Sequence, residues 1–168
     1  MSVYFIADDY DGPVKIGISV NINRRILQLQ TGNPRPLKLM GFIKTETREQ
    51  DFELEREFHK IYRGKNISGE WFHLHPNEVL DAIRRFYYQG FLARSEDCLK
   101  FLGRDKDGIP EIGGVWDWGG LDWEDCCPYC GCVCGLVYEE ELMLHECVNC
   151  GYNWIENDTE EVRPIDDE

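Results

Sequence analysis

Four cysteines have the type and spacing needed to bind a metal ion. They form two CxxC pairs separated by sixteen residues, each pair followed by a glycine: Cys127, Cys130, Cys147 and Cys150. Each pair brings two thiolates onto one tight turn, and the following glycine can adopt the left-handed backbone that aims amide donors at sulfur. Two such turns complete a tetrahedral four-sulfur site, so the pattern predicts a structural zinc ion in a small C-terminal zinc ribbon.

Two other interpretations of the cysteines stay open. The first is a disulfide cluster or redox site. It is disfavoured because residues 1–9 reach two aspartates after a short apolar run, unlike a secretory signal, so we expect a cytoplasmic protein. The second is a different ligand set, in which a neighbouring residue replaces one of the four. The candidates are Cys126, Cys132, Cys134 and His145, although cysteines of this kind are more commonly small buried residues.

A glutamate and a histidine one helical turn apart form a second candidate. Glu55 and His59 lie four residues apart in a segment with helical periodicity, an arrangement that can share a metal ion or a proton. The plainer interpretation is that Glu55 is an exposed acid, like Glu53 and Glu57 beside it, and that His59 is structural.

The charge of the chain is divided unevenly along its length. The net charge is −14, but residues 1–75 carry eleven basic and ten acidic side chains, whereas residues 76–168 carry seven and twenty-two. Only the second part should repel DNA phosphates, so we expect DNA to contact the first. No apolar run approaches the ~20 residues that a membrane span needs, which predicts a soluble protein with no membrane partner.

Local patterns predict the elements that must position these residues. Thr47–Gln50 has the form of a capping box, and the helix after it places Leu54, Phe58 and Ile61 on one stripe. We expect strands at 2–7, 14–19, 37–44 and 69–74, with helices at 22–31, after residue 47, and from Pro76, the last carrying Val79, Leu80, Ile83, Phe86 and Tyr87. The order β-β-α-β-α-β-α predicts an α+β protein with a small mixed α/β domain.

Five short motifs follow one another in this first part: Val3–Ile6, Val14–Gly17, Asn23–Asn33, Leu54–His59 and Ser68–Phe72. Together they resemble the GIY-YIG nuclease superfamily, especially its phage-type subgroup, whose second motif reads Lys-Ile-Gly. The resemblance covers residues 2–90 and implies a central antiparallel sheet flanked by helices.

The resemblance implies a divalent-metal-dependent DNA endonuclease. It places the first-motif tyrosine at Tyr4, the arginine of the first helix at Arg25, and the glutamate that holds Mg²⁺ or Mn²⁺ at Glu55. These residue types suit phosphodiester hydrolysis, since a carboxylate holds a hard cation, a guanidinium pairs with phosphate, and a tyrosine orients or deprotonates water. The subgroup also shares His59, and Glu70 either pairs structurally or supplies a second carboxylate.

Lys15 departs from the wider superfamily, which has tyrosine at this position. An ammonium there can bind phosphate or lower the pKa of Tyr4, but it cannot pass a proton as a phenol does. Three further cations are expected to contact DNA: Arg24, Arg35 and Lys38.

The chain is expected to divide into four regions: a nuclease-like domain at 1–102 with its core at 2–90, a Trp/Gly/Asp-rich connector at 103–125, the zinc ribbon at 126–155 and an acidic tail at 156–168. The connector tryptophans Trp116, Trp118 and Trp123 either stack on bases or, as their acidic neighbours favour, dock the connector against a domain.

A second function stays open beside the nuclease. Lys15 and the acidity beyond residue 75 favour a non-catalytic DNA-binding module or an acidic protein-interaction module that retains the fold. A protein partner would then contact the zinc ribbon, the connector or the tail.

Overall fold

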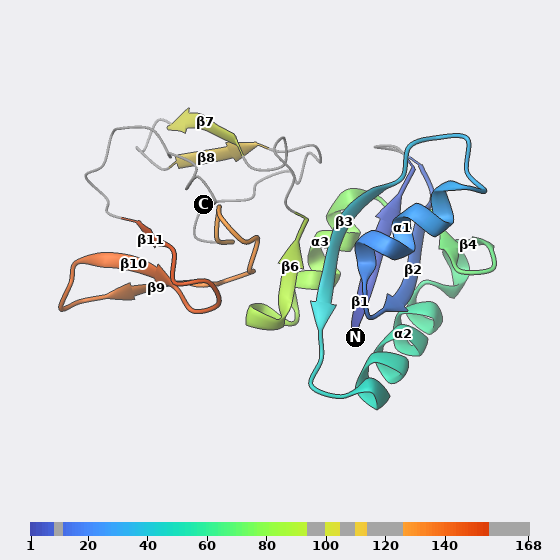
Figure 1. Cartoon of the computed structure of the whole chain (residues 1–168), viewed down its shortest axis with the longest axis horizontal. Coiled ribbons are helices and arrows are strands. Elements are labelled where there is room, and N and C mark those ends of the chain that lie inside the picture. Colours follow the sequence, from blue (N-terminus) through green and yellow to red (C-terminus); the bar gives the residue numbers. More distant parts are fainter. Residues whose placement is uncertain (9–11, 94–99, 105–109, 114–125, 155–168) are drawn as a thin grey trace.

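A six-stranded antiparallel sheet forms the framework of the protein. The computed structural model describes residues 1–8, 12–93, 100–104, 110–113 and 126–154. The strands of this sheet lie in the order β4-β5-β2-β1-β3-β6 (Figure 1). In chain order the elements of this part are β1 (Ser2–Ala7), β2 (Val14–Ser19), α1 (Ile22–Gln30), β3 (Lys38–Lys44), α2 (Arg48–Ile61), β4 (Asn66–Ser68), β5 (Trp71–Phe72), α3 (Pro76–Arg84) and β6 (Gly90–Leu92).

The hairpin of β1 and β2 occupies the middle of the sheet. Its register pairs Tyr4 with Gly17 and Ile6 with Lys15, so these four residues share one face. Phe5 points to the opposite face, as the alternation along a strand requires.

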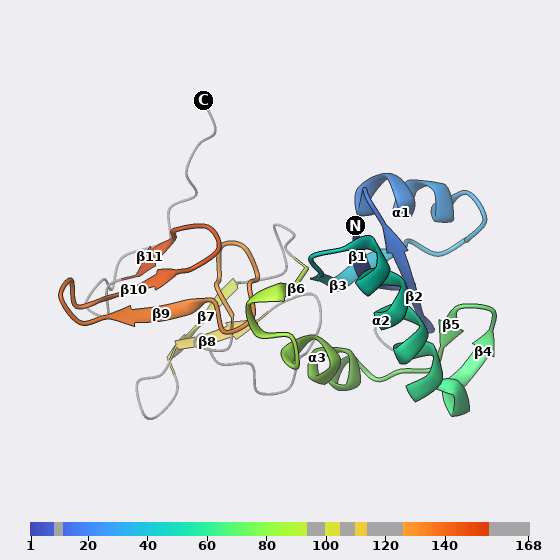
Figure 2. The same ribbon diagram turned by 90° about the horizontal axis from the view of Figure 1, so that it is seen from below.

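Each face of the sheet is covered by its own helices. α2 and α3 pack on the face that carries Phe5, where Leu54 and Ile83 join the main hydrophobic core. α1 packs on the other face, where Ile26 joins a smaller cluster with Tyr4. Figure 2 shows α1 on one side of the strands and α2 and α3 on the other. The predicted α+β class with a central antiparallel sheet is confirmed.

The helix starts agree with the local sequence. The side chain of Asn21 caps α1, and Thr47 and Gln50 form the predicted capping box at the start of α2. A second capping box, formed by His75 and Glu78, begins α3 and was not predicted.

The structure corrects the expected elements in several places. Ile61 is 48% exposed because it is the last residue of α2, and Tyr87 is 61% exposed because α3 ends at Arg84 and a short 3₁₀ turn follows. The strand expected at 69–74 is reduced to β5, since Gly69 turns with φ of 54° between β4 and β5. β4 and β6 were not predicted, because three-residue strands carry too little periodicity.

The C-terminal part holds two smaller sheets. β9 (Leu136–Glu139), β10 (Leu144–Cys147) and β11 (Asn153–Trp154) form one, and β7 (Lys100–Arg104) pairs with β8 (Pro110–Gly113) in the other. The three connector tryptophans and the acidic tail lie outside the described residues. In the described part of the chain, every helix is too short or too polar to cross a membrane.

Candidate functional site

Tyr4 and Arg25 are in contact on the α1 face of the sheet. The Nε of Arg25 donates a hydrogen bond to Tyr4 Oη at 3.4 Å, and Tyr4 is only 1% exposed. Burial is the main cause that raises the pKa of Tyr4; Arg25 opposes this shift, while the carboxylates of Glu70 and Glu55 add to it. Tyr4 is therefore a neutral phenol at ordinary pH and can donate a hydrogen bond.

Gly17 makes room for the Tyr4 hydroxyl. A Cβ atom at Gly17 would lie 2.6 Å from Tyr4 Oη and 2.9 Å from Tyr4 Cζ, closer than real Cβ contacts. The phenol therefore occupies the space above its cross-strand partner. The sequence places Gly17 in the second motif but does not by itself predict that it makes space for the Tyr4 ring. The feature that could have indicated this is its position opposite Tyr4 in the hairpin.

Lys15 forms an ion pair with Glu70 across the β2–β5 edge. Lys15 is only 6% exposed, and its Nζ lies 5.7 Å from the centre of the Trp71 ring. The backbone supports this contact, because the N–H of Ile16 donates to the carbonyl of Glu70 at 3.1 Å. The group that lowers the pKa of Tyr4 against the effect of burial is Arg25, and the ammonium of Lys15 pairs with Glu70.

Glu55 and His59 lie on α2 where this helix packs against β2. The Nε2–H of His59 donates to the carbonyl of Ile16 at 3.1 Å, and the ring packs on Phe72, so His59 holds α2 on the sheet. Partial burial is the main cause that raises the pKa of Glu55; Glu70 adds to the shift, and His59 opposes it. Glu55 thus lies within electrostatic reach of the Lys15–Glu70 pair.

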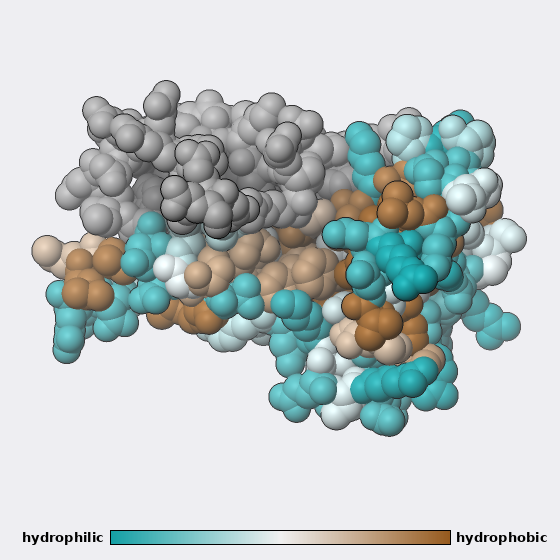
Figure 3. Space-filling view, in the orientation of Figure 1, coloured by the Kyte–Doolittle hydropathy of each residue, from teal (hydrophilic) through white to brown (hydrophobic). Residues whose placement is uncertain are grey.

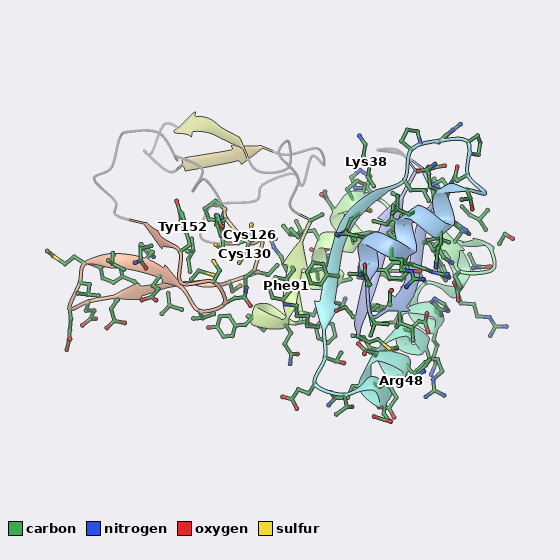
Figure 4. The ribbon with its side chains drawn as sticks, in the orientation of Figure 1. Lys38, Arg48, Phe91, Cys126, Cys130 and Tyr152 are labelled. Atoms are coloured by element: carbon green, nitrogen blue, oxygen red, sulfur yellow. The ribbon has the colours of Figure 1, made fainter. Side chains whose placement is uncertain are left out.

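The three cations expected to contact DNA are all exposed. Arg24 follows the N-cap of α1, Arg35 lies 3.9 Å from Asp8, and Lys38 begins β3 (Figure 4). Over α1, the face turned toward the viewer in Figure 3 is largely hydrophilic, with separate apolar patches. An exposed polar face of this kind is accessible to a phosphate backbone.

The four CxxC cysteines come together at the other end of the molecule. Their Sγ atoms all lie within 4.8 Å of one another, with 3.8 Å between Cys127 and Cys150 and 3.6 Å between Cys130 and Cys147. A tetrahedral zinc site with Zn–S bonds of about 2.3 Å has sulfur–sulfur edges of about 3.8 Å. A disulfide needs about 2.05 Å, and none of the seven cysteines of the described residues is in a disulfide. This cluster could hold zinc.

The turns around the cluster have the geometry of metal-binding knuckles. Gly131 and Gly151 adopt φ of 75° and 71°, as predicted, and their N–H groups donate at 2.8 Å to the carbonyls of Cys127 and Cys147, the first cysteine of each pair. The side-chain amide of Asn149 donates to Cys130 Sγ at 3.5 Å. The neighbouring Cys127 and Cys132, together with Asn149, lower the pKa of the Cys130 thiol. A donor outside the ligand set, such as the Asn149 amide, is a usual partner of a metal-binding sulfur.

The neighbouring candidates for the ligand set lie outside it. Cys126 and Cys132 are fully buried, as expected for small core residues, and the ring of His145 packs on Tyr138 with centroids 5.0 Å apart. Within the described residues, the four CxxC cysteines make up the one group of three or more potential ligands that meet at a common point.

The hairpin with its Lys-Ile-Gly strand, the following helix and the Glu55 helix define a GIY-YIG-like fold. The family model that matches the chain is the T5orf172 domain, over residues 1–87, so the chain belongs to this GIY-YIG-like nuclease family. No curated protein and no solved structure matches the chain. Membership suggests nuclease chemistry. The match contains the candidate site residues Tyr4, Lys15, Arg25, Glu55 and Glu70 but neither β6 nor the cysteine site.

Proposed function

We propose that this protein is a divalent-metal-dependent endonuclease that hydrolyses phosphodiester bonds in DNA. The observation that carries the proposal is the cluster of Tyr4, Lys15, Arg25, Glu55 and Glu70, which joins residues of β1, β2, α1, α2 and the β4–β5 turn. The pKa values of the tyrosine, the arginine and the α2 glutamate all respond to Glu70, so the five groups form one electrostatic unit. Cations, a phenol and carboxylates in one place suit a phosphate substrate.

Each side chain has a role that follows from its surroundings. Arg25 is half-buried against Tyr4, so its guanidinium is oriented to pair with a phosphate group. Tyr4 stays protonated and orients the attacking water or the phosphate by donating a hydrogen bond. Lys15 lies beside them as the ion-pair partner of Glu70, and His59 positions the helix that carries Glu55.

Glu55 is the residue that would hold Mg²⁺ or Mn²⁺, with Glu70 as the second carboxylate in reach. The two carboxylates suit a cation because they repel each other. Burial and the charge of Glu70 disfavour the ionised form of Glu55, which raises its pKa, and a bound cation would favour that form. Mg²⁺ commonly binds through one or two carboxylates, taking its other ligands from water and phosphate. When bound, the ion would neutralise the charge that develops on the leaving oxygen.

The test is nicking of supercoiled DNA with Mg²⁺ or Mn²⁺. We expect Glu55→Ala to be the most damaging change, Arg25→Ala to weaken both DNA affinity and rate, and Tyr4→Phe to slow nicking without weakening affinity. Glu57→Ala, an exposed neighbour on the same helix, is the matched control and should stay active. Equal nicking by the Glu55 and Glu57 variants would contradict the proposed site.

The Lys15–Glu70 ion pair supports a second candidate function. Lys15 stands where the wider superfamily has a tyrosine, and it occupies Glu70, one of the two carboxylates. The cluster would therefore also suit a non-catalytic module that binds DNA phosphates or a protein partner. DNA affinity that is insensitive to Glu55→Ala, with no nicking under any metal, would favour this candidate.

We further propose that the cysteine cluster binds one structural zinc ion. Its four thiols match the sulfur spacing of a closed tetrahedral site, which leaves no open position for catalysis. The ribbon would therefore serve structure, or contact with DNA or a protein, rather than the reaction.

A further inference from the structure

The first cysteine pair lies against the outer edge of β6. On its inner edge β6 pairs with β3, and on its outer edge Leu92 N–H donates to Gly131 O while Val133 N–H donates to Gly90 O, both at 2.9 Å. Between these two bonds, Phe91 and Cys132 form an antiparallel bridge. Residues 131–133 therefore continue the six-stranded sheet as a short additional strand.

Side chains on both faces extend this contact. On one face, Val133 and Cys126 are at most 1% exposed and belong to the same hydrophobic core as Ile83 of α3. On the other face, Phe91 packs with the ligand cysteines Cys127 and Cys147. Figure 4 shows Phe91 between the large sheet and the part of the ribbon that carries Cys130. The sheet and the metal site therefore share their packing.

Gly131 lies where the two backbones are too close to leave room for a side chain. Its φ of 75° suits glycine, and a Cβ atom there would lie 2.2 Å from the carbonyl oxygen of Leu92. Gly151 occupies the equivalent position after the second pair, with φ of 71°, but the nearest atom to its Cβ would be 3.9 Å away, on Glu146. Only the first glycine is required for contact with β6.

We propose that metal binding at the cysteine cluster stabilises the six-stranded sheet, most of which lies within the T5orf172 match, by fixing residues 131–133 on its β6 edge. Loss of the metal releases this strand, which leaves the N–H of Leu92 and the carbonyl of Gly90 without protein partners and exposes Phe91. The coupling rests on metal binding by the cluster and is independent of nuclease activity. It makes the stability of the family domain sensitive to chelation and to thiol oxidation.

Hydrogen exchange on the full chain, with zinc and after chelation, tests the coupling. We expect exchange in residues 90–93 to rise by about tenfold or more on metal removal. Cys150→Ser removes an exposed ligand that lies outside the β6 contact, so it should reproduce this change. Unchanged protection of residues 90–93 after zinc loss, while the ribbon itself exchanges faster, would overturn the proposal. A preparation that binds no zinc would also overturn it, whereas nicking by that preparation would leave the nuclease proposal intact.

A matched pair of glycine variants tests the contact itself. Gly131→Ala and Gly151→Ala introduce the same strain at a positive φ, but only Gly131→Ala collides with β6. In zinc-loaded protein we expect Gly131→Ala to speed exchange in residues 90–93 and to lower the Tm more than Gly151→Ala does. Equal exchange and equal Tm in the two variants would show that the β6 contact does not carry the coupling.

Discussion

Replacing Gly17 by alanine should push Tyr4 out of its place. The new Cβ atom would lie 2.6 Å from Tyr4 Oη and 2.9 Å from Cζ, and Tyr4 is 1% exposed, so the ring has little room to move. Overpacking of this kind costs about 1–3 kcal/mol. The smaller entropy of the unfolded alanine chain returns about 0.4–1 kcal/mol.

Taking the middle of each range, the net loss in the free energy of unfolding is about 1.3 kcal/mol. For a chain of 168 residues this lowers the Tm by about 3–5 °C. Thermal unfolding followed by circular dichroism measures the shift. Gly64→Ala is the control, because its Cβ would meet no atom within 4 Å, and it should be neutral or slightly stabilising.

A double variant tests whether the clash is with the phenol. Tyr4→Phe removes the hydroxyl, the atom nearest to the new Cβ, so it should be less damaging in Gly17→Ala than in the native background, with a coupling of about 0.5 kcal/mol or more. The nicking rate of Gly17→Ala should also fall at temperatures where the variant stays folded, because the Tyr4–Arg25 contact is disturbed. A Tm for Gly17→Ala equal to that of Gly64→Ala would refute this reasoning.

Two further predictions concern Glu55 and the metal. Because burial chiefly raises the pKa of Glu55, its ionised form costs stability above that pKa, so Glu55→Gln should raise the Tm at pH 7. The gain should shrink as the pH falls toward the ordinary glutamate value of 4.5; a gain that grows on acidification in thermal scans would contradict the assignment. Elemental analysis should find one zinc per chain, with most of it lost in Cys127→Ser; less than about half an equivalent, with the knuckle cysteines in disulfides, would refute a zinc site.

Local patterns were sufficient for the parts of the protein whose determinants lie close together in the chain. Alternating residues predicted the β1–β2 hairpin, and Thr47 with Gln50 predicted the start of α2. The CxxC spacing predicted which four thiols would meet. In each case the partners are neighbours or belong to two turns of known shape, so short-range geometry decides the outcome.

The candidate site was only partly predictable for the same reason. The motif resemblance selected Tyr4, Arg25 and Glu55, and Arg25 does contact Tyr4 while Arg24 faces solvent. The Lys15–Glu70 pair joins residues 55 positions apart, and no local pattern relates them. The roles of the individual residues remain predictions that the nicking assay tests.

The sequence by itself determined the ingredients: a β-hairpin with a Lys-Ile-Gly strand, helices with defined starts, and four thiols at metal-binding spacing. Only the tertiary structure decided what they touch. In the folded chain the Tyr4 hydroxyl lies over Gly17, Lys15 forms an ion pair with Glu70, and the residues after the first cysteine pair bind the edge of β6. These contacts depend on how buried surfaces fit between elements far apart in the chain, and packing of this kind leaves no periodic trace along the sequence.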